Sequence, residues 1–202
     1  MRDMICEKDL GRYKAILVAG MPGSGKGLFS EVARLCGLSV FVMGDIIREE
    51  IIRRGLIINY ETSRSVSMKL REELGSEAVA ILTHRKICLS DNLSSHIIID
   101  GVRSIDEVNY FKKIFEKIYL VAIHSSPSTR FKRIYSRSRE DDPRAWEDFV
   151  SRDLQELSFG LGSVIALADY MIVNEDIDMD TLKRLIIGLL ERILGRSCGI
   201  IS

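Results

Sequence analysis

The chain has 202 residues, with 29 basic and 29 acidic side chains, so its formal net charge is zero. A chain of this length fits one ordinary domain with a real hydrophobic core. Because no net field would attract nucleic acid or a membrane surface, we expect neither as a partner. Residues 1–13 are largely polar and charges interrupt the long apolar runs, so the sequence predicts a cytoplasmic protein without a signal peptide or spanning segment.

The chain has four cysteines, Cys6, Cys36, Cys88 and Cys198. They show no CxxC spacing, and no histidine lies at zinc-ligand spacing from them. Two lie in apolar helical stretches, where a buried free thiol is the favoured interpretation. A disulfide between two of them is the alternative, because some hyperthermophile proteins form disulfides inside the cell.

The predicted elements alternate along the chain. Strands are expected at 15–19, 38–43, 96–100, 118–123 and 170–173. Helices are expected between Lys26 and Gly37 and at 46–54, 61–74, 76–89, 104–115, 127–138, 143–158 and 164–168, with an amphipathic helix closing the chain. The two helices at 61–89 carry few large apolar residues, which favours a small mobile lobe over the core.

Strands that alternate with helices predict an α/β fold, in which right-handed crossovers join parallel strands and helices cover both faces. Ligands in such sheets bind beyond the carboxyl ends of the strands. Each predicted strand here ends in polar or glycine residues, so we expect the functional groups to converge on one edge of the sheet.

The first strand leads into the strongest functional signal, a phosphate-binding loop. The loop and its immediate flanks are Gly20, Met21, Pro22, Gly23, Ser24, Gly25, Lys26, Gly27 and Leu28. A strand before the glycines and a helix after them distinguish such a loop from a plain glycine-rich turn. Backbone N–H groups and the helix N-terminus would surround phosphate oxygens, and Lys26 would add a full positive charge.

One position departs from the common pattern GxxxxGK[ST]. Gly27 stands where that pattern has a hydroxyl. Mg²⁺ would then have to be held by phosphate oxygens, water and a carboxylate from elsewhere. Asp100, which ends the apolar run IIID, is the candidate metal ligand, and a turn or helix-capping aspartate is the alternative.

Several arginines follow the strand ends. Arg48 and Arg103 could together form a second phosphate site, since arginine binds phosphate bidentately, although each alone could be a surface charge. Arg130, Arg133 and Arg137 share one face of a helix. Spacing alone slightly favours a solvated face there, and the alternative is that this face, with Arg152 of the next helix, stabilises a transferring phosphoryl group.

The segments GMPGSGKG, MGDIIRE and DGVRS, followed by an R-x-x-x-R helix, two aspartates and another arginine, resemble the nucleoside monophosphate kinases, adenylate kinase above all. A glycine directly after the loop lysine is itself the adenylate-kinase form. The segment from Ala168 to Asn174 also looks like dephospho-coenzyme A kinase. The resemblance covers nearly the whole chain for an archaeal group related to both, through the stretches DGVRSxxEVxxF, HSxPxxR and GxGxVIAxADYxxxN.

This resemblance implies a single P-loop kinase domain over residues 1–202 with a five-stranded sheet of order 2-3-1-4-5. It implies a helical acceptor-binding insertion at 56–92, and a short lid with flanking helices at 127–158. ATP and Mg²⁺ are the implied cofactors. Arg48 and Arg103 match residues that bind the acceptor monophosphate, and Asn174 lies where the loop after the last strand approaches the adenine. Arg133, Arg137 and Arg152 match lid arginines around the transferring phosphoryl group.

The departures from adenylate kinase concern the base more than the phosphates. Leu28 and Met43 replace threonines of that family, the lid is short, and DGVRS lacks the proline–aromatic context that frames the adenine of AMP. The leading hypothesis is phosphoryl transfer from ATP to a nucleoside monophosphate, with AMP favoured. One alternative is a hydroxyl kinase of the dephospho-coenzyme A type, with Asp45 as substrate-binding base. Another is an ATP- or AMP-binding regulator or weak ATPase. The oligomeric state is left open.

Overall fold

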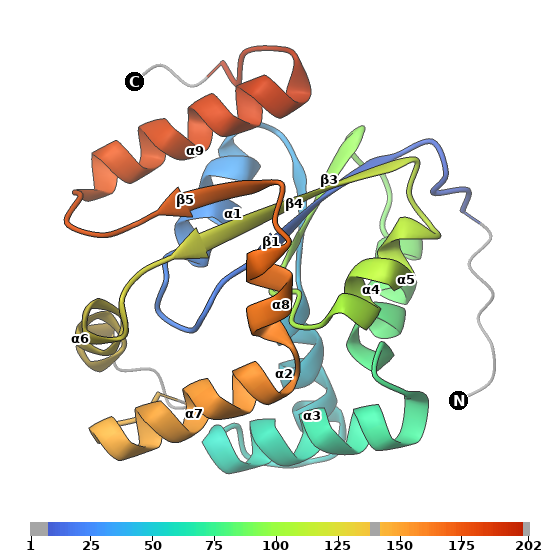
Figure 1. The fold of residues 1–202 in the computed structure, drawn as a ribbon. Helices are drawn as coiled ribbons and strands as arrows, with labels where there is room; N and C mark the ends of the chain where they lie inside the picture. The colour runs from blue at the N-terminus through green and yellow to red at the C-terminus, as the bar shows by residue number, and fades with distance from the viewer. Residues whose placement is uncertain (1–7, 138–141, 200–202) are drawn as a thin grey trace.

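Five parallel strands form the central sheet in the computed structural model, which describes residues 8–137 and 142–199 (Figure 1). The strands are β1 (Lys14–Ala19), β2 (Ser39–Val42), β3 (His96–Asp100), β4 (Lys117–His124) and β5 (Tyr170–Val173). Their order is β2-β3-β1-β4-β5, and every neighbouring pair is parallel. The predicted α/β class and strand order are therefore confirmed.

The central strand, β1, explains why this sheet needs helices on both sides. Ala15 to Ala19 are completely buried, and the neighbouring β3 is buried along its whole length. Because side chains alternate across a strand, Leu17 enters one core and Ile16 and Val18 enter the other. Apolar residues on both faces are typical of a parallel sheet covered twice.

Most of the helices contribute to one of these two cores (Figure 1). Their bounds are α1 (Lys26–Leu35), α2 (Met43–Arg53), α3 (Tyr60–Leu74), α4 (Ala78–Cys88), α5 (Ile105–Lys112), α6 (Pro127–Arg137), α7 (Trp146–Ser158), α8 (Leu161–Ala166) and α9 (Met179–Leu194). Helices α1 and α9 cover one face and share a core with Ile16 and Val18. Helices α2, α3, α4, α5 and α8 contribute to the core on the other face.

The boundaries differ from the predictions mainly at helix starts. Helix α2 begins at Met43, so that Gly44 and Asp45 belong to its first turn rather than to a preceding loop. Helix α7 begins at Trp146, three residues beyond the Pro143 at which we expected it to open. Residues 138–141, which include the end of the predicted helix at 127–138 and the predicted short lid, lie outside the described residues.

Helices α3 and α4 are more firmly packed than their sequences suggested. Val66 and Leu70 of α3 are buried, as are Val79 and Ile87 of α4. All four belong to the same apolar cluster as the sheet residue Leu17. A modest number of well-placed apolar residues is enough, because only one stripe of each helix faces the core.

The prediction of free thiols was wrong for Cys36. It forms a disulfide with Cys198, and the two Cα atoms lie 4.6 Å apart. Cys36 follows α1 and Cys198 follows α9, two helices that pack together on the same face of the sheet. Cys88 is disulfide-bonded as well. The sequence could not reveal the Cys36 pairing, because 162 residues separate its partners and only helix packing brings them together.

Within the described residues, no helix has both the length and the apolar character that crossing a membrane requires.

We predict that Cys198→Ser lowers the free energy of unfolding by about 2–5 kcal/mol, because the bond closes a long loop and so restricts the unfolded chain. Guanidinium-induced unfolding under non-reducing conditions measures this change. Ser197→Ala is the matched control, since it alters the neighbouring exposed residue and keeps the bond. An unchanged unfolding midpoint for Cys198→Ser would contradict a stabilising role.

Candidate active site

The glycine-rich loop between β1 and α1 has a backbone that side chains would not permit. Gly20 and Gly25 have φ values of 155° and 111°, and Gly25 is the N-cap of α1. A Cβ atom on Gly20 would lie 2.5 Å from the carbonyl oxygen of Ile123, and one on Gly25 would lie 2.5 Å from Nδ2 of Asn174. The loop therefore packs tightly against the ends of β4 and β5.

Side chains outside the loop bind its carbonyl groups. Asn174 donates from Nδ2 to the Ser24 carbonyl oxygen at 2.9 Å, and Arg130 donates from Nη1 to the Pro22 carbonyl oxygen at 3.2 Å. These hydrogen bonds fix the loop backbone at the N-terminus of α1, a position that suits a bound phosphate.

The loop opens onto a cleft of about 950 Å³ at the carboxyl edge of the sheet. Most of the predicted site residues line it: Lys26, Gly27, Leu28, Asp45, Arg48, Asp100, Arg103, Arg133, Arg137, Arg152 and Asn174, together with Pro22, Gly23 and Gly25 of the loop. Gly20, Met21 and Ser24 lie in the loop but do not line the cleft. The tertiary structure thus brings together residues from the whole length of the chain.

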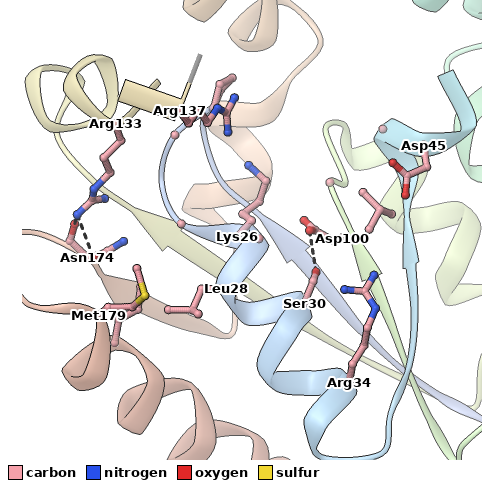
Figure 2. A pocket seen from close by; sticks show the side chains of 18 of the residues that line it. Lys26, Leu28, Ser30, Arg34, Asp45, Asp100, Arg133, Arg137, Asn174 and Met179 are labelled. Atoms are coloured by element: carbon pink, nitrogen blue, oxygen red, sulfur yellow. Dashed lines mark hydrogen bonds between the residues drawn. The ribbon is translucent and has the colours of Figure 1, made fainter. Parts of the chain in front are cut away.

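Lys26 lies between Arg137 and Asp100 in the middle of this cleft (Figure 2). Its Nζ donates to the carbonyl oxygens of Gly20 at 2.6 Å and Met21 at 3.3 Å. Burial lowers the pKa of Lys26 to about 8, although the carboxylates of Asp100 and Glu156 oppose the change. A bound anion would restore the preference of this amine for its charged form.

Asp100 is 5% exposed and fits the role of a metal ligand. Its Oδ2 accepts a 2.8 Å hydrogen bond from the Ser30 hydroxyl, whereas its Oδ1 has no partner among the described residues. Burial raises the pKa of Asp100, and Lys26 opposes this rise. A buried carboxylate oxygen without a partner, beside a phosphate-binding loop, is suited to a hard cation such as Mg²⁺.

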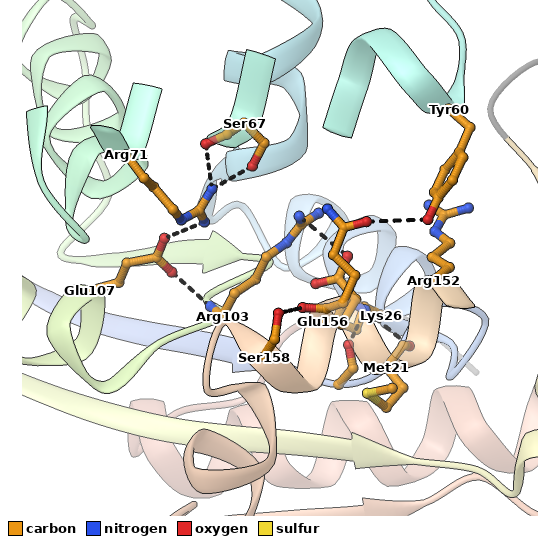
Figure 3. Close-up of polar contacts among 12 residues, drawn as sticks. Met21, Lys26, Tyr60, Ser67, Arg71, Arg103, Glu107, Arg152, Glu156 and Ser158 are labelled. Carbon is orange, nitrogen blue, oxygen red and sulfur yellow. Dashed lines mark hydrogen bonds and ion pairs between the residues drawn. The ribbon is translucent and has the colours of Figure 1, made fainter. Parts of the chain in front are cut away.

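The predicted second phosphate site consists of two arginines held by carboxylates. Arg48 forms an ion pair with Asp45 one turn away in α2. Arg103 lies in the segment after β3, and its Nη1 is 3.3 Å from Oε1 of Glu156 in α7 (Figure 3). Both arginines line the cleft. A phosphate bound there would compete with these carboxylates for the guanidinium groups.

The prediction that the basic face of α6 is solvated is wrong for Arg130. This side chain is 3% exposed and forms a bidentate ion pair with Asp153 of α7, with one N–O distance of 2.8 Å. Its guanidinium also lies 5.0 Å from the ring centre of Phe149. Spacing could not distinguish it from its neighbours, because α7 covers only part of the helix face.

Arg133 and Arg137, on the same face of α6, do line the cleft. Arg133 donates to Asn174 and to the Ser125 hydroxyl, and Arg137 forms an ion pair with Asp142 at 2.7 Å. Arg152 approaches the same Asp142 from α7, at 3.5 Å. The structure therefore groups the three predicted lid arginines on one side of the cleft.

The sequence predicted Leu28 as a site residue but did not reveal other residues in and beside the cleft. Met179 and Leu182 line the cleft together with Leu28 and give it an apolar wall against which a flat base could pack. Leu28 and Met179 lie near Asn174 (Figure 2). Ser30 and Glu156 were not considered. The sequence did offer a signal for both. Each lies four residues after a predicted site residue, Lys26 or Arg152, and residues four apart share one face of a helix.

Comparisons with known proteins give the family and the fold to which this chain is similar. A family model described as "AAA domain" matches residues 19–149. A relative from Hyperthermus butylicus, which is named UPF0200 protein, is 56% identical over 160 residues. The match covers 79% of this chain and 84% of the relative's chain. Another from Thermococcus onnurineus, also a UPF0200 protein, is 46% identical over 182 residues, covering 89% and 98%.

Among solved structures, shikimate kinase from Bacteroides thetaiotaomicron has a TM-score of 0.57 at 15% identity, covering 90% of this chain and 98% of its own. At that identity the likeness shows the fold. Fold and loop together define a P-loop kinase-like protein. On the relatives' identity and coverage, the chain belongs to the UPF0200 family.

We predict that ATP binding takes up about half a proton near pH 8, because about half of the Lys26 amines are then neutral and phosphate binding restores their charge. Because the pKa of Lys26 is lowered to about 8, more of this amine is neutral as the pH rises above 8, and ATP affinity should fall. Calorimetry at pH 8 in two buffers with different ionisation enthalpies measures the uptake.

Lys26→Arg is the control, because a guanidinium stays charged at this pH and should take up no proton. Equal binding enthalpies for the unsubstituted protein in the two buffers would show that Lys26 is already charged.

Proposed function

We propose that this protein is an ATP-dependent phosphotransferase that moves the γ-phosphoryl group to a nucleoside monophosphate, with AMP as the favoured acceptor. One observation carries the proposal: the same cleft is lined by the phosphate-binding loop with Lys26 and by the arginine pair Arg48 and Arg103. Two phosphate sites facing one cleft suit a donor and an acceptor that are both phosphorylated.

On the donor side, the loop N–H groups and Lys26 would hold the phosphates of ATP, and the apolar wall of Leu28, Met179 and Leu182 would face the base. Asp100 would hold Mg²⁺, which when bound neutralises charge on the β- and γ-phosphate oxygens. Ser30 keeps one oxygen of Asp100 engaged and so orients the other.

On the acceptor side, Arg48 and Arg103 would bind the monophosphate and align its oxygen with the γ-phosphorus. Arg133, Arg137 and Arg152 line the cleft and would stabilise negative charge on the transferring group. An acceptor phosphate is already substantially ionised at neutral pH, so the reaction requires no general base.

Two alternatives remain. A hydroxyl kinase benefits from a base, and Asp45 is the candidate because it lines the cleft and lies near enough to influence the titration of Asp100. Its ion pair with Arg48 weakens that candidacy. A regulator or weak ATPase is supported by the missing hydroxyl at Leu28, which stands where adenylate kinases have a threonine. The shikimate kinase likeness concerns the fold and does not choose among acceptors.

Turnover with Mg·ATP should depend on the acceptor. We expect ADP formation with AMP, tested beside CMP, UMP, GMP and dephospho-coenzyme A. Lys26→Ala should abolish it, because this substitution removes the charge that holds the donor phosphates. Activity only with dephospho-coenzyme A would support the hydroxyl kinase. AMP binding without acceptor-dependent turnover would support the regulator.

Asp45→Asn separates the two kinase proposals. In a nucleotide kinase we expect the substitution to lower kcat by less than about tenfold, because no proton has to be removed by Asp45. In a hydroxyl kinase, loss of the base should lower kcat by about a hundredfold or more. Steady-state kinetics at saturating ATP measure the difference, and retained ATP affinity would verify that the donor site is intact.

A further inference from the structure

A small recess adjoins the cleft beyond the two arginines of the acceptor side. It has a volume of about 100 Å³ and lies among α2, α3 and α7. Its lining consists of Gly44, Ile47, Arg48, Tyr60, Ser63, Arg64, Ser67, Arg103, Arg152, Gln155 and Glu156. Arg48, Arg103 and Arg152 line both the cleft and the recess, so one molecule could extend from one into the other.

Glu156 is the unusual member of this lining. It is 6% exposed, and its Oε1 forms the ion pair with Arg103. Its other oxygen, Oε2, is buried and accepts no hydrogen bond from any of the described residues. A buried acceptor without a donor is unfavourable, and more so when it is charged, so this oxygen is suited to a ligand that supplies the donor.

Contacts between α7 and α3 fix the helix that carries Glu156. Helix α7 also carries Gln155, whose Oε1 accepts a 3.2 Å hydrogen bond from the Tyr60 hydroxyl at the start of α3. The guanidinium of Arg152, one turn before Glu156, lies 5.9 Å from the ring centre of Tyr60 (Figure 3). These contacts join α7 to α3 across the recess.

The chemistry of a carboxylate restricts what can bind to it. An ionised carboxylate only accepts hydrogen bonds, and it repels a phosphate placed directly against it. Because Oε1 of Glu156 contacts the same guanidinium that would bind the acceptor phosphate, Oε2 would face the group next to that phosphate. In a nucleoside monophosphate that group is the ribose, whose hydroxyls are donors.

We propose that Glu156 recognises a ribose hydroxyl of the acceptor nucleotide and thereby selects ribonucleotides over deoxyribonucleotides. This inference rests on the proposed function, because it assumes a nucleoside monophosphate at Arg48 and Arg103. A ribose hydroxyl would donate to the buried Oε2 of Glu156, whereas an acceptor without that hydroxyl would leave Oε2 without a hydrogen-bond donor.

The test compares AMP, 2′-deoxy-AMP and 3′-deoxy-AMP by calorimetry and by steady-state kinetics. We expect the unsubstituted protein to bind AMP about tenfold or more tightly than at least one deoxy analogue, as the loss of a hydrogen bond to a charged group predicts. Glu156→Gln should reduce that ratio to less than about threefold, because an amide oxygen without full charge accepts more weakly. Glu147→Gln, an exposed position of the same helix, is the matched control and should keep the full ratio.

A purely structural role for Glu156, such as holding Arg103, gives a different result. Glu156→Gln would then weaken AMP and both deoxy analogues by the same factor, and the unchanged ratio would overturn the inference. Equal binding of all three nucleotides to the unsubstituted protein would also overturn it. An unchanged far-UV circular dichroism spectrum and an unchanged thermal unfolding midpoint for Glu156→Gln would show that the variant is folded.

The binding measurement also separates this inference from the proposed function. Discrimination that Glu156→Gln removes, without any AMP-dependent turnover, would support the ribose contact and overturn the kinase. AMP-dependent turnover, with a ribose preference that Glu156→Gln leaves unchanged, would support the kinase and overturn the ribose contact. Absence of AMP binding would overturn both.

Discussion

The tight packing of the phosphate-binding loop against β4 and β5 is the constraint on which the rest of the site depends. Gly20 and Gly25 approach neighbouring atoms so closely that no side chain fits, and Asn174 and Arg130 bind the outer carbonyl groups of the loop. These hydrogen bonds fix the loop backbone beside the cleft. Lys26 is the first residue of α1, and at this end of the helix the helix dipole also favours an anion.

The cleft balances its arginines with carboxylates from neighbouring elements. Arg103 pairs with Glu156, Arg137 with Asp142, and Arg48 with Asp45. Such pairs keep buried or half-buried guanidinium groups oriented, which pre-organises them for phosphate. An acceptor phosphate would bind by competing with these carboxylates, and the carboxylate oxygens that remain near it are then available to read hydroxyl groups. The same ion pairs would thus contribute to both affinity and selectivity.

Residue by residue, the predictions succeeded where the signal was local. The strand at His96–Asp100 and the start of α5 were correct, and at that start the Ser104 hydroxyl accepts a hydrogen bond from the Glu107 N–H. They failed where a distant partner decides the environment. Arg130 looked like a solvated charge and is buried against Asp153, and Cys36 looked like a free thiol and is bonded to Cys198.

By itself the sequence determined the α/β alternation, the phosphate-binding loop and the polar strand ends, because these follow from hydrophobic period and from glycine and lysine chemistry within short segments. The strand order came from resemblance. Only the tertiary structure decided which arginines face the cleft, that Ser30 engages Asp100, and that Glu156 reaches Arg103 with one oxygen unpartnered among the described residues. Each of these depends on how helices pack across the sheet edge, and helix period alone does not specify which neighbour covers a given face.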